Sequence, residues 1–135
     1  YKMSEISQNA ERVRKYKARK NAVEILVDSP TEKHLWDCII AFQDYRFHTI
    51  SGLPFSYTLK TGRNGEYTKE LFIDCRENSK SLAWSSVRMA FEKALEKKGA
   101  VFTRPQELAD VRGVSYVFRL LWRFGMISVT DSVPK

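Results

Sequence analysis

The spacing of hydrophobic residues changes along the chain from helical to alternating and back to helical, which predicts a mixed α+β fold. The first helical stretch gathers its apolar residues on one side, and these are Leu35, Trp36, Ile39, Ile40 and Phe42. Ser29-Pro30-Thr31-Glu32 precedes this stretch, with Ser29 suited to the N-cap and Pro30 to the first helical position. We therefore expect a helix that begins at Pro30. A later helix is predicted from about residue 81 to residue 98, with caps among Asn78–Ser81 and an end at Gly99.

Between these helices, the apolar residues alternate with polar ones, which is typical of a β-hairpin. Phe55, Tyr57 and Leu59 form one apolar set, and Leu71 and Ile73 form the other. A three-residue turn at 63–65, with Gly65 in the left-handed conformation, places both sets on one face. It sets Phe55 opposite Ile73 and Tyr57 opposite Leu71, whereas a two-residue turn at Asn64-Gly65 would mix apolar with polar positions. Phe72 is then expected on the outer face.

The last third of the chain predicts two short helices followed by a strand. We expect a first helix over Gln106–Asp110, a turn over 111–113, a second helix over Ser115–Phe124 closed by Gly125, and a strand in MISVTD. This strand is expected to pair with the hairpin. The predicted fold is a single α+β domain over residues 28–135, with helices packed on a small antiparallel sheet in a winged-helix-like arrangement. Residues 1–27 form a separate basic helix or arm.

The second of these helices has two contrasting sides. At 100° per residue, its core side consists of Val117, Leu120, Leu121 and Phe124, and its outer side consists of Ser115, Tyr116, Arg119 and Arg123. Ala109 and the turn residue Gly113 stand four positions apart, and Val114 and Ser115 follow. In these respects residues 103–125 resemble the helix-turn-helix family of DNA-binding proteins. The sequence departs from the family pattern at Arg112 and Arg119, where apolar residues are usual.

The resemblance implies that the second helix reads DNA. The residues expected at base edges are Ser115, Tyr116, Arg119 and Arg123, and those expected at phosphates are Arg104 and Arg112. Residues 62–87, GRNGEYTKELFIDCRENSKSLAWSSV, are also similar to small proteins of bacterial mobile elements. Such a protein would regulate transcription or act as an accessory factor of the element.

The charge of the chain supports an anionic partner. Its 23 Lys and Arg exceed its 16 Asp and Glu, for a formal net charge of +7. The densest cationic stretch contains Arg12, Arg14, Lys15, Lys17, Arg19 and Lys20. This stretch has little apolar surface, so it is either a solvated helix or an arm that orders on phosphates. Duplex DNA is the partner that we expect.

Two other functions compete with DNA binding. The chain is a protein-binding accessory or inhibitory module of a nucleic-acid machine if Phe72, Phe118 and Trp122 form an exposed hydrophobic patch. A homodimer or a larger protein partner would fit such a patch. A metal-dependent nuclease would use Glu66, Lys69, Glu70 and Asp74.

An enzyme is not expected, because the sequence has no glycine-rich phosphate loop, no HExxH and no nucleophile elbow. We expect no cofactor and no metal. Cys38 and Cys75 lie in apolar runs, which favours buried, reduced thiols and a cytoplasmic protein. No apolar stretch reaches the roughly 18 residues of a membrane span, so no membrane association is expected.

Overall fold

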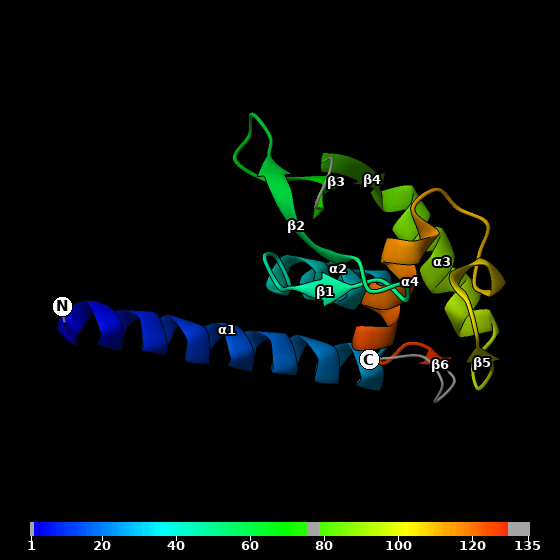
Figure 1. Ribbon diagram of the computed structural model, residues 1–135, viewed down its shortest axis with the longest axis horizontal. Helices are drawn as coiled ribbons and strands as arrows, with labels where there is room; N and C mark the ends of the chain where they lie inside the picture. The colour runs from blue at the N-terminus through cyan, green and yellow to red at the C-terminus, as the bar shows by residue number, and fades with distance from the viewer. Residues whose placement is uncertain (1, 76–78, 130–135) are drawn as a thin grey trace. The chain divides into compact units, whose positions relative to one another are not determined.

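The computed structural model describes residues 2–75 and 79–129, with side chains described for residues 8–74 and 81–129. The chain divides into two compact units, Tyr1–Phe42 and Gln43–Lys135. Over the described residues the fold is α+β, with four α-helices, a four-stranded antiparallel sheet and a separate pair of parallel strands (Figure 1). The mixed fold class predicted from the sequence is therefore confirmed.

The first unit consists of α1 (Lys2–Asp28) and α2 (Glu32–Ala41). With 27 residues, α1 is ~40 Å long, whereas the 10 residues of α2 extend over only ~15 Å. Among the side chains of α1 from residue 8 onwards, the buried ones are Ala22 and Leu26, which lie in the C-terminal half of the helix. Within this unit, α2 is therefore long enough to cover only part of α1.

The start of α2 differs from the prediction. Thr31 is the N-cap, and its side chain accepts a hydrogen bond from the His34 N–H at 3.2 Å. The N–H of Ser29 still donates to the carbonyl of Ile25 at 2.9 Å. Ser29 therefore closes α1 and does not cap α2, which moves the cap two residues along the chain.

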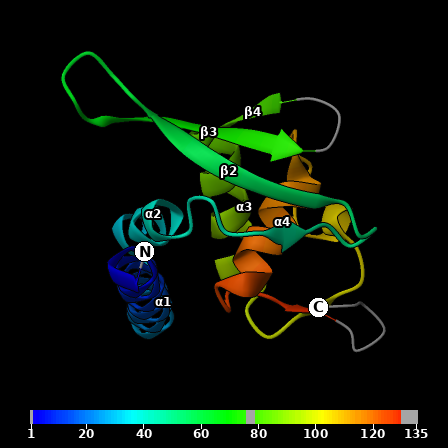
Figure 2. The ribbon, with the colours of Figure 1, turned by 60° about the vertical axis from the view of Figure 1, so that its left-hand side comes forward.

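The sheet of the second unit has the order β1-β2-β3-β4, and all its strands are antiparallel (Figure 2). Its strands are β1 (Phe47–His48), β2 (Pro54–Thr61), β3 (Tyr67–Cys75) and β4 (Ser79–Ala83). The residues of the predicted hairpin face, Phe55, Tyr57, Leu59, Leu71 and Ile73, are all buried. The hairpin and its apolar face are therefore confirmed.

The register of the hairpin was predicted correctly only near the turn. The Gly62 N–H donates to the Glu66 carbonyl at 2.7 Å, and Gly65 has φ 81°, as the three-residue turn requires. Between Thr61 and Leu59 a bulge shifts the pairing by two residues, so Tyr57 lies opposite Ile73 and not opposite Leu71. Because side chains alternate with a period of two, this even shift keeps the apolar sets on one face.

A strand replaces the start of the predicted helix at residues 81–98. Residues Ser79–Ala83 form β4, and α3 runs from Trp84 to Glu96. Leu82 is buried between exposed Ser81 and Ala83, which is a strand pattern. The helix begins after Ala83 without a side-chain cap, so the predicted capping by Ser79 or Ser81 was wrong. Asn78 lies outside the described residues.

The C-terminal elements are β5 (Val101–Phe102), the 3-10 helix η1 (Pro105–Glu107), α4 (Val114–Arg123) and β6 (Ser128–Val129). The strand expected after Gly125 is present as β6, but it pairs in parallel with β5 and not with the hairpin. The reason is that β1 and β4 already occupy both edges of the hairpin. Because β6 does not join the sheet of the hairpin, the expected winged-helix arrangement is not shown.

Both α3 and α4 lie on the same face of the sheet (Figure 2). Tyr116 of α4 contacts Phe55 of β2 edge-on, with ring centroids 5.0 Å apart. In α3, the residues Trp84, Val87, Ala90, Phe91 and Ala94 are buried. Among the described helices, none is both long and apolar enough to cross a membrane.

Candidate nucleic-acid interface

The predicted second helix is present as α4, which begins one residue earlier than expected. Its N-cap, Gly113, has φ 77°, in the left-handed region that favours glycine. A Cβ at this position would lie 2.8 Å from Leu82 Cδ1, so no other residue fits without movement. The start of α4 is thus fixed by its close approach to β4.

The predicted first helix, Gln106–Asp110, was wrong. In its place the chain makes one 3-10 turn at Pro105–Glu107, with the Leu108 N–H bonded to the Pro105 carbonyl at 3.0 Å. The Glu107 carboxylate reaches back to accept hydrogen bonds from the Thr103 N–H and hydroxyl. These contacts close the turn, and Leu108 and Ala109 then enter the core.

The two helix faces expected for α4 are only partly confirmed. The four residues predicted for the core, Val117, Leu120, Leu121 and Phe124, are buried. Tyr116 was expected to face outwards, but it is only 8% exposed because it packs on Phe55. Phe118 was expected in an exposed patch, but it is fully buried beside Phe102, at a centroid distance of 6.3 Å. The apolar face of α4 is therefore wider than the sequence suggested.

The accessible side of this segment is a single stripe, which we call the α4 stripe: Arg112, Ser115, Arg119, Trp122 and Arg123. Within α4, steps of three and four residues place Ser115, Arg119, Trp122 and Arg123 on one side of the helix, and Arg112 precedes them in the turn before Gly113. Arg112 and Arg123 are exposed, whereas the other three are partly exposed. The stripe contains three cations and no acidic residue. It is chemically suited to an anion.

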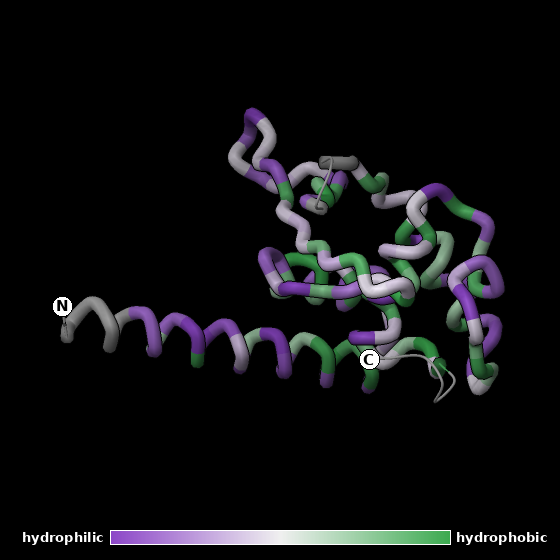
Figure 3. The backbone as a smooth tube through the Cα atoms, viewed as in Figure 1, coloured by the Kyte–Doolittle hydropathy of each residue, from purple (hydrophilic) through white to green (hydrophobic). Residues whose placement is uncertain are grey.

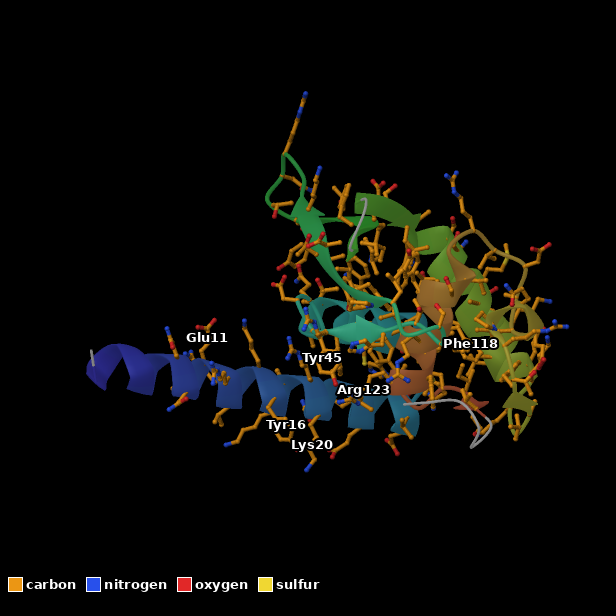
Figure 4. The ribbon with its side chains drawn as sticks, viewed as in Figure 1. Glu11, Tyr16, Lys20, Tyr45, Phe118 and Arg123 are labelled. Carbon is orange, nitrogen blue, oxygen red and sulfur yellow. The ribbon has the colours of Figure 1, made fainter. Side chains whose placement is uncertain are left out.

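At the C-terminal end of the stripe, the arginines lie on aromatic rings. The Arg119 guanidinium lies 4.4 Å from the Trp122 ring centre, and the Arg123 guanidinium lies 5.4 Å from that of Tyr45. Arg123 Nε also donates to the Tyr45 hydroxyl at 3.3 Å (Figure 4). Sequence reasoning missed Tyr45, because 78 positions separate it from Arg123 and no local pattern links them.

Burial lowers the pKa of Arg119; the neighbouring Tyr45 opposes this effect and the charge of Arg123 adds to it. An arginine nevertheless stays protonated at neutral pH. Arg119 Nε is buried and has no hydrogen-bond partner among the described residues. Arg119 is thus partly a packing residue, whereas Arg123 is the more accessible cation of the pair.

At the N-terminal end, the structure brings Arg112, Ser115 and Tyr116 together around a hollow of about 680 Å³. The other polar residues that line it are Glu70, Ser81 and Ser86. Glu70 places an acidic group in the same hollow as Arg112, so the charge there is mixed.

Arg104, the remaining cation predicted for this unit, is exposed, and its Nε lies 3.8 Å from Glu107 Oε2. The hydrogen bonds from Thr103 lower the pKa of the Glu107 carboxyl, and the charges of Arg104 and Lys97 lower it further. Arg104 therefore contributes to the local electrostatics of η1.

In the first unit, the predicted cations lie on α1 in a stretch that we call the α1 basic segment, Arg12–Lys20. Five of its six cations are exposed, namely Arg12, Arg14, Lys15, Lys17 and Lys20. Lys15 pairs with Glu11 at 3.6 Å, and the other four have no ion pair or hydrogen bond to any described residue. Tyr16 and Lys20 project from the same side of the helix (Figure 4).

Arg19 is the exception within the α1 basic segment. Its Nε donates to the Ala41 carbonyl at 3.0 Å, and its guanidinium lies 5.7 Å from the Phe42 ring centre. From residue 8 onwards, hydrophilic residues dominate the middle turns of α1, and hydrophobic residues become frequent towards its C-terminal end (Figure 3). Arg19 thus joins α1 to α2, whereas Arg12, Arg14, Lys17 and Lys20 remain available to a partner.

The exposed hydrophobic patch expected for a protein partner is not formed, because Phe118 is buried. Phe72 is only partly exposed, and the Lys60 ammonium lies 4.1 Å from its ring centre. Trp122 is partly covered by Arg119.

The residues considered for a nuclease do not form a metal site. Asp74 lies opposite Ser56 in the sheet, and Glu66 holds the hairpin turn with Asn64. Among the described side chains, no three His, Cys, Asp or Glu residues are close enough together to hold a metal ion.

The Cys38 thiol is free and buried, as predicted. Burial raises its pKa to about 12, and the charge of Asp37 adds to this effect. The side chain of Cys75 lies outside the described residues. Comparisons of this chain with protein-family models, with curated proteins and with solved structures found no match.

Proposed function

We propose that this protein is a non-enzymatic DNA-binding protein that regulates transcription or serves as an accessory factor of a mobile element. The observation that carries the proposal is the exposure of the α1 basic segment. Four of its cations have no ion pair or hydrogen bond to any described residue. A surface cation that forms no ion pair is free to neutralise a phosphate.

The affinity in this proposal comes mainly from counterion release. Duplex DNA holds a condensed layer of cations, and each phosphate neutralised by a lysine or arginine releases part of that layer. The α1 basic segment is suited to this role because its cations surround most of the helix. Such contacts do not depend on the base sequence.

The α4 stripe supplies the second contact. Arg112 and Arg123 are its exposed cations, and Ser115 is a partly exposed hydrogen-bonding group between them. In the finer, winged-helix-like form of the proposal, this side of α4 approaches the DNA and Arg123 reaches a phosphate or a base edge. Tyr116 is buried against Phe55 of β2 and so holds the helix against the sheet.

The test is fluorescence anisotropy with a labelled duplex, in low salt and then at rising salt. Wild type is compared with Arg14→Ala/Lys17→Ala/Lys20→Ala and with a control that loses the same charge elsewhere, Lys33→Ala/Arg88→Ala/Lys98→Ala. All six residues are exposed. We expect wild type to bind and to weaken steeply with salt, and the α1 variant to bind at least about tenfold more weakly than the control. Equal affinities of the two variants would contradict the proposal.

A second candidate function is the protein-binding accessory module. The observation that favours it is a set of exposed apolar residues on α1: Val13, Tyr16, Ile25 and Val27, which are 50%, 64%, 41% and 54% exposed. Val13 and Tyr16 lie among cations, so a protein complementary to this part of α1 would combine apolar with acidic groups. Absence of duplex binding by wild type in low salt would favour this function over DNA binding.

A further inference from the structure

The hairpin of β2 and β3 continues well beyond the core as a two-stranded ribbon. Leu59 and Leu71 are paired and buried, and they are the last core residues on their strands. Every residue from Lys60 to Lys69 is exposed except Gly62, which is partly exposed. The ribbon projects from the sheet as the loop at the top of Figure 1. We call residues 60–69 the β-ribbon.

Several hydrogen bonds stiffen the β-ribbon. Asn64 Oδ1 accepts from the Glu66 N–H at 3.1 Å, which adds to the Gly62–Glu66 backbone bond across the turn. At the base, the Gln43 side chain accepts from the Leu59 N–H at 3.0 Å and donates to the Tyr67 hydroxyl at 3.4 Å. The ribbon is therefore held at both ends, and a stiff element loses less entropy on binding.

The cations of the β-ribbon are Lys60, Arg63 and Lys69, against one acidic residue, Glu66. The ammonium groups of Lys60 and Lys69 lie over aromatic rings, at 4.1 Å from that of Phe72 and 5.3 Å from that of Trp84. Arg63 occupies the turn, is exposed, and has no ion pair or hydrogen bond to any described residue. The tip thus presents a free guanidinium, the group most often used to read guanine.

The dimensions of the β-ribbon match a DNA groove. From Leu59 to Asn64 at the tip of the turn there are five residue steps, which span roughly 16 Å at about 3.3 Å each. The major groove of duplex DNA is about 12 Å wide and about 8.5 Å deep, and it admits a two-stranded ribbon. The ribbon is therefore long enough to reach the floor of the groove while the sheet stays outside.

We propose that the β-ribbon enters the major groove of duplex DNA and that Arg63 donates to the O6 and N7 atoms of a guanine. This inference rests on the proposed DNA-binding function and adds to it a direct contact with the bases. Lys60 and Lys69 face the phosphates along the groove. A duplex is the partner favoured here, because an unpaired strand has no groove to receive the ribbon.

The test uses a labelled duplex selected by the wild-type protein from a randomised pool. Arg63→Ala is compared with wild type and with Arg88→Ala, which removes the same charge from an exposed position on α3. We expect Arg63→Ala to weaken binding by about 5- to 100-fold, and Arg88→Ala to have little effect. In a second arm, 7-deazaguanine replaces guanine, which removes the N7 acceptor. Wild type should weaken on this duplex, and Arg63→Ala should not weaken further.

The outcomes separate this inference from the proposed function. If wild type binds and Arg63→Ala matches it, the groove contact is wrong and DNA binding stands. If Arg63→Ala weakens binding but 7-deazaguanine has no effect on wild type, Arg63 contacts a phosphate and the base contact is wrong. If wild type binds no duplex, including in low salt, the proposed function itself fails. Circular dichroism of Arg63→Ala confirms that this surface variant folds.

Discussion

The two helices expected to contact DNA, α1 and α4, differ in how many of their side chains are buried. Residues 8–18 of α1 are all exposed. In α4, by contrast, the buried side chains are those of Tyr116, Val117, Phe118, Leu120 and Leu121. The α1 basic segment has too few apolar residues to pack, whereas α4 has a wide apolar face. Apolar content, more than the number of cations, decides which helix stays on the surface.

This difference has a consequence for the cations themselves. Apart from Arg19, the cations of the α1 basic segment are exposed to solvent, so their removal should change binding and leave stability nearly unchanged. Arg119 and Arg123 of α4 rest on Trp122 and Tyr45, so their removal also takes away packing. The same substitution, cation to alanine, should therefore have different effects in the two helices.

The largest expected effect is that of Leu120→Ala in α4. Leu120 is fully buried, and such a truncation costs about 2–5 kcal/mol of the free energy of unfolding, because it loses apolar burial and leaves a cavity. Val13→Ala on α1, where Val13 is 50% exposed, should cost no more than about 0.5 kcal/mol. Urea denaturation of both variants measures the difference. Similar costs would mean that the two helices do not differ in burial as described.

A smaller effect is expected where α4 begins. Gly113→Ala should cost about 1–2 kcal/mol of the free energy of unfolding, because alanine is disfavoured at positive φ. The loss of stability should be larger still because the Cβ of the alanine would lie 2.8 Å from Leu82 Cδ1. Gly65→Ala is the matched control, since Gly65 has φ 81° and no atom within 4 Å of the added Cβ. Urea midpoints that shift equally for both variants would show that Leu82 moves aside freely.

The smallest effect concerns the carboxylate that closes η1 before α4. The pKa of Glu107 is lowered in the folded protein from 4.5, chiefly by the hydrogen bonds from Thr103. Its contribution to stability is therefore present above the unfolded pKa and is lost as the pH falls through the lower, folded value. Wild type should be more stable than Glu107→Gln at pH 7, and this difference should shrink in acid. A difference in urea midpoint between the two proteins that grows in acid would contradict the lowered pKa of Glu107.

The parts of the fold that were predictable from the sequence depend on local patterns. Gly65 and the alternating residues of the hairpin fix its turn and its buried face. Gly113, the apolar positions of α4 and Gly125 fix that helix. In each case the residue types of a short segment indicate the local backbone, so the element can be predicted before its distant contacts are known, although Leu82 also restricts position 113 to glycine.

The parts that were not predictable depend on partners far away in the chain. The bulge between Leu59 and Thr61 and the strand β4 arise from pairing with β3, and no local residue signals either. The contact of Arg123 with Tyr45 has the same character. The burial of Tyr116 and Phe118 depends on Phe55 and Phe102. A helical wheel shows which residues share a face but not how many faces are covered.

The most direct test of the central claim is the salt dependence of duplex affinity for variants of the two helices. The logarithm of the association constant is plotted against the logarithm of the salt concentration for three proteins: wild type, Arg14→Ala/Lys17→Ala/Lys20→Ala on α1, and Arg119→Ala/Arg123→Ala on α4. The slope should become shallower by about three for the α1 variant and by about one or less for the α4 variant, because only Arg123 of that pair is exposed. A larger change for the α4 variant, with the α1 variant at the wild-type slope, would contradict the claim that the exposed cations of α1 provide the affinity.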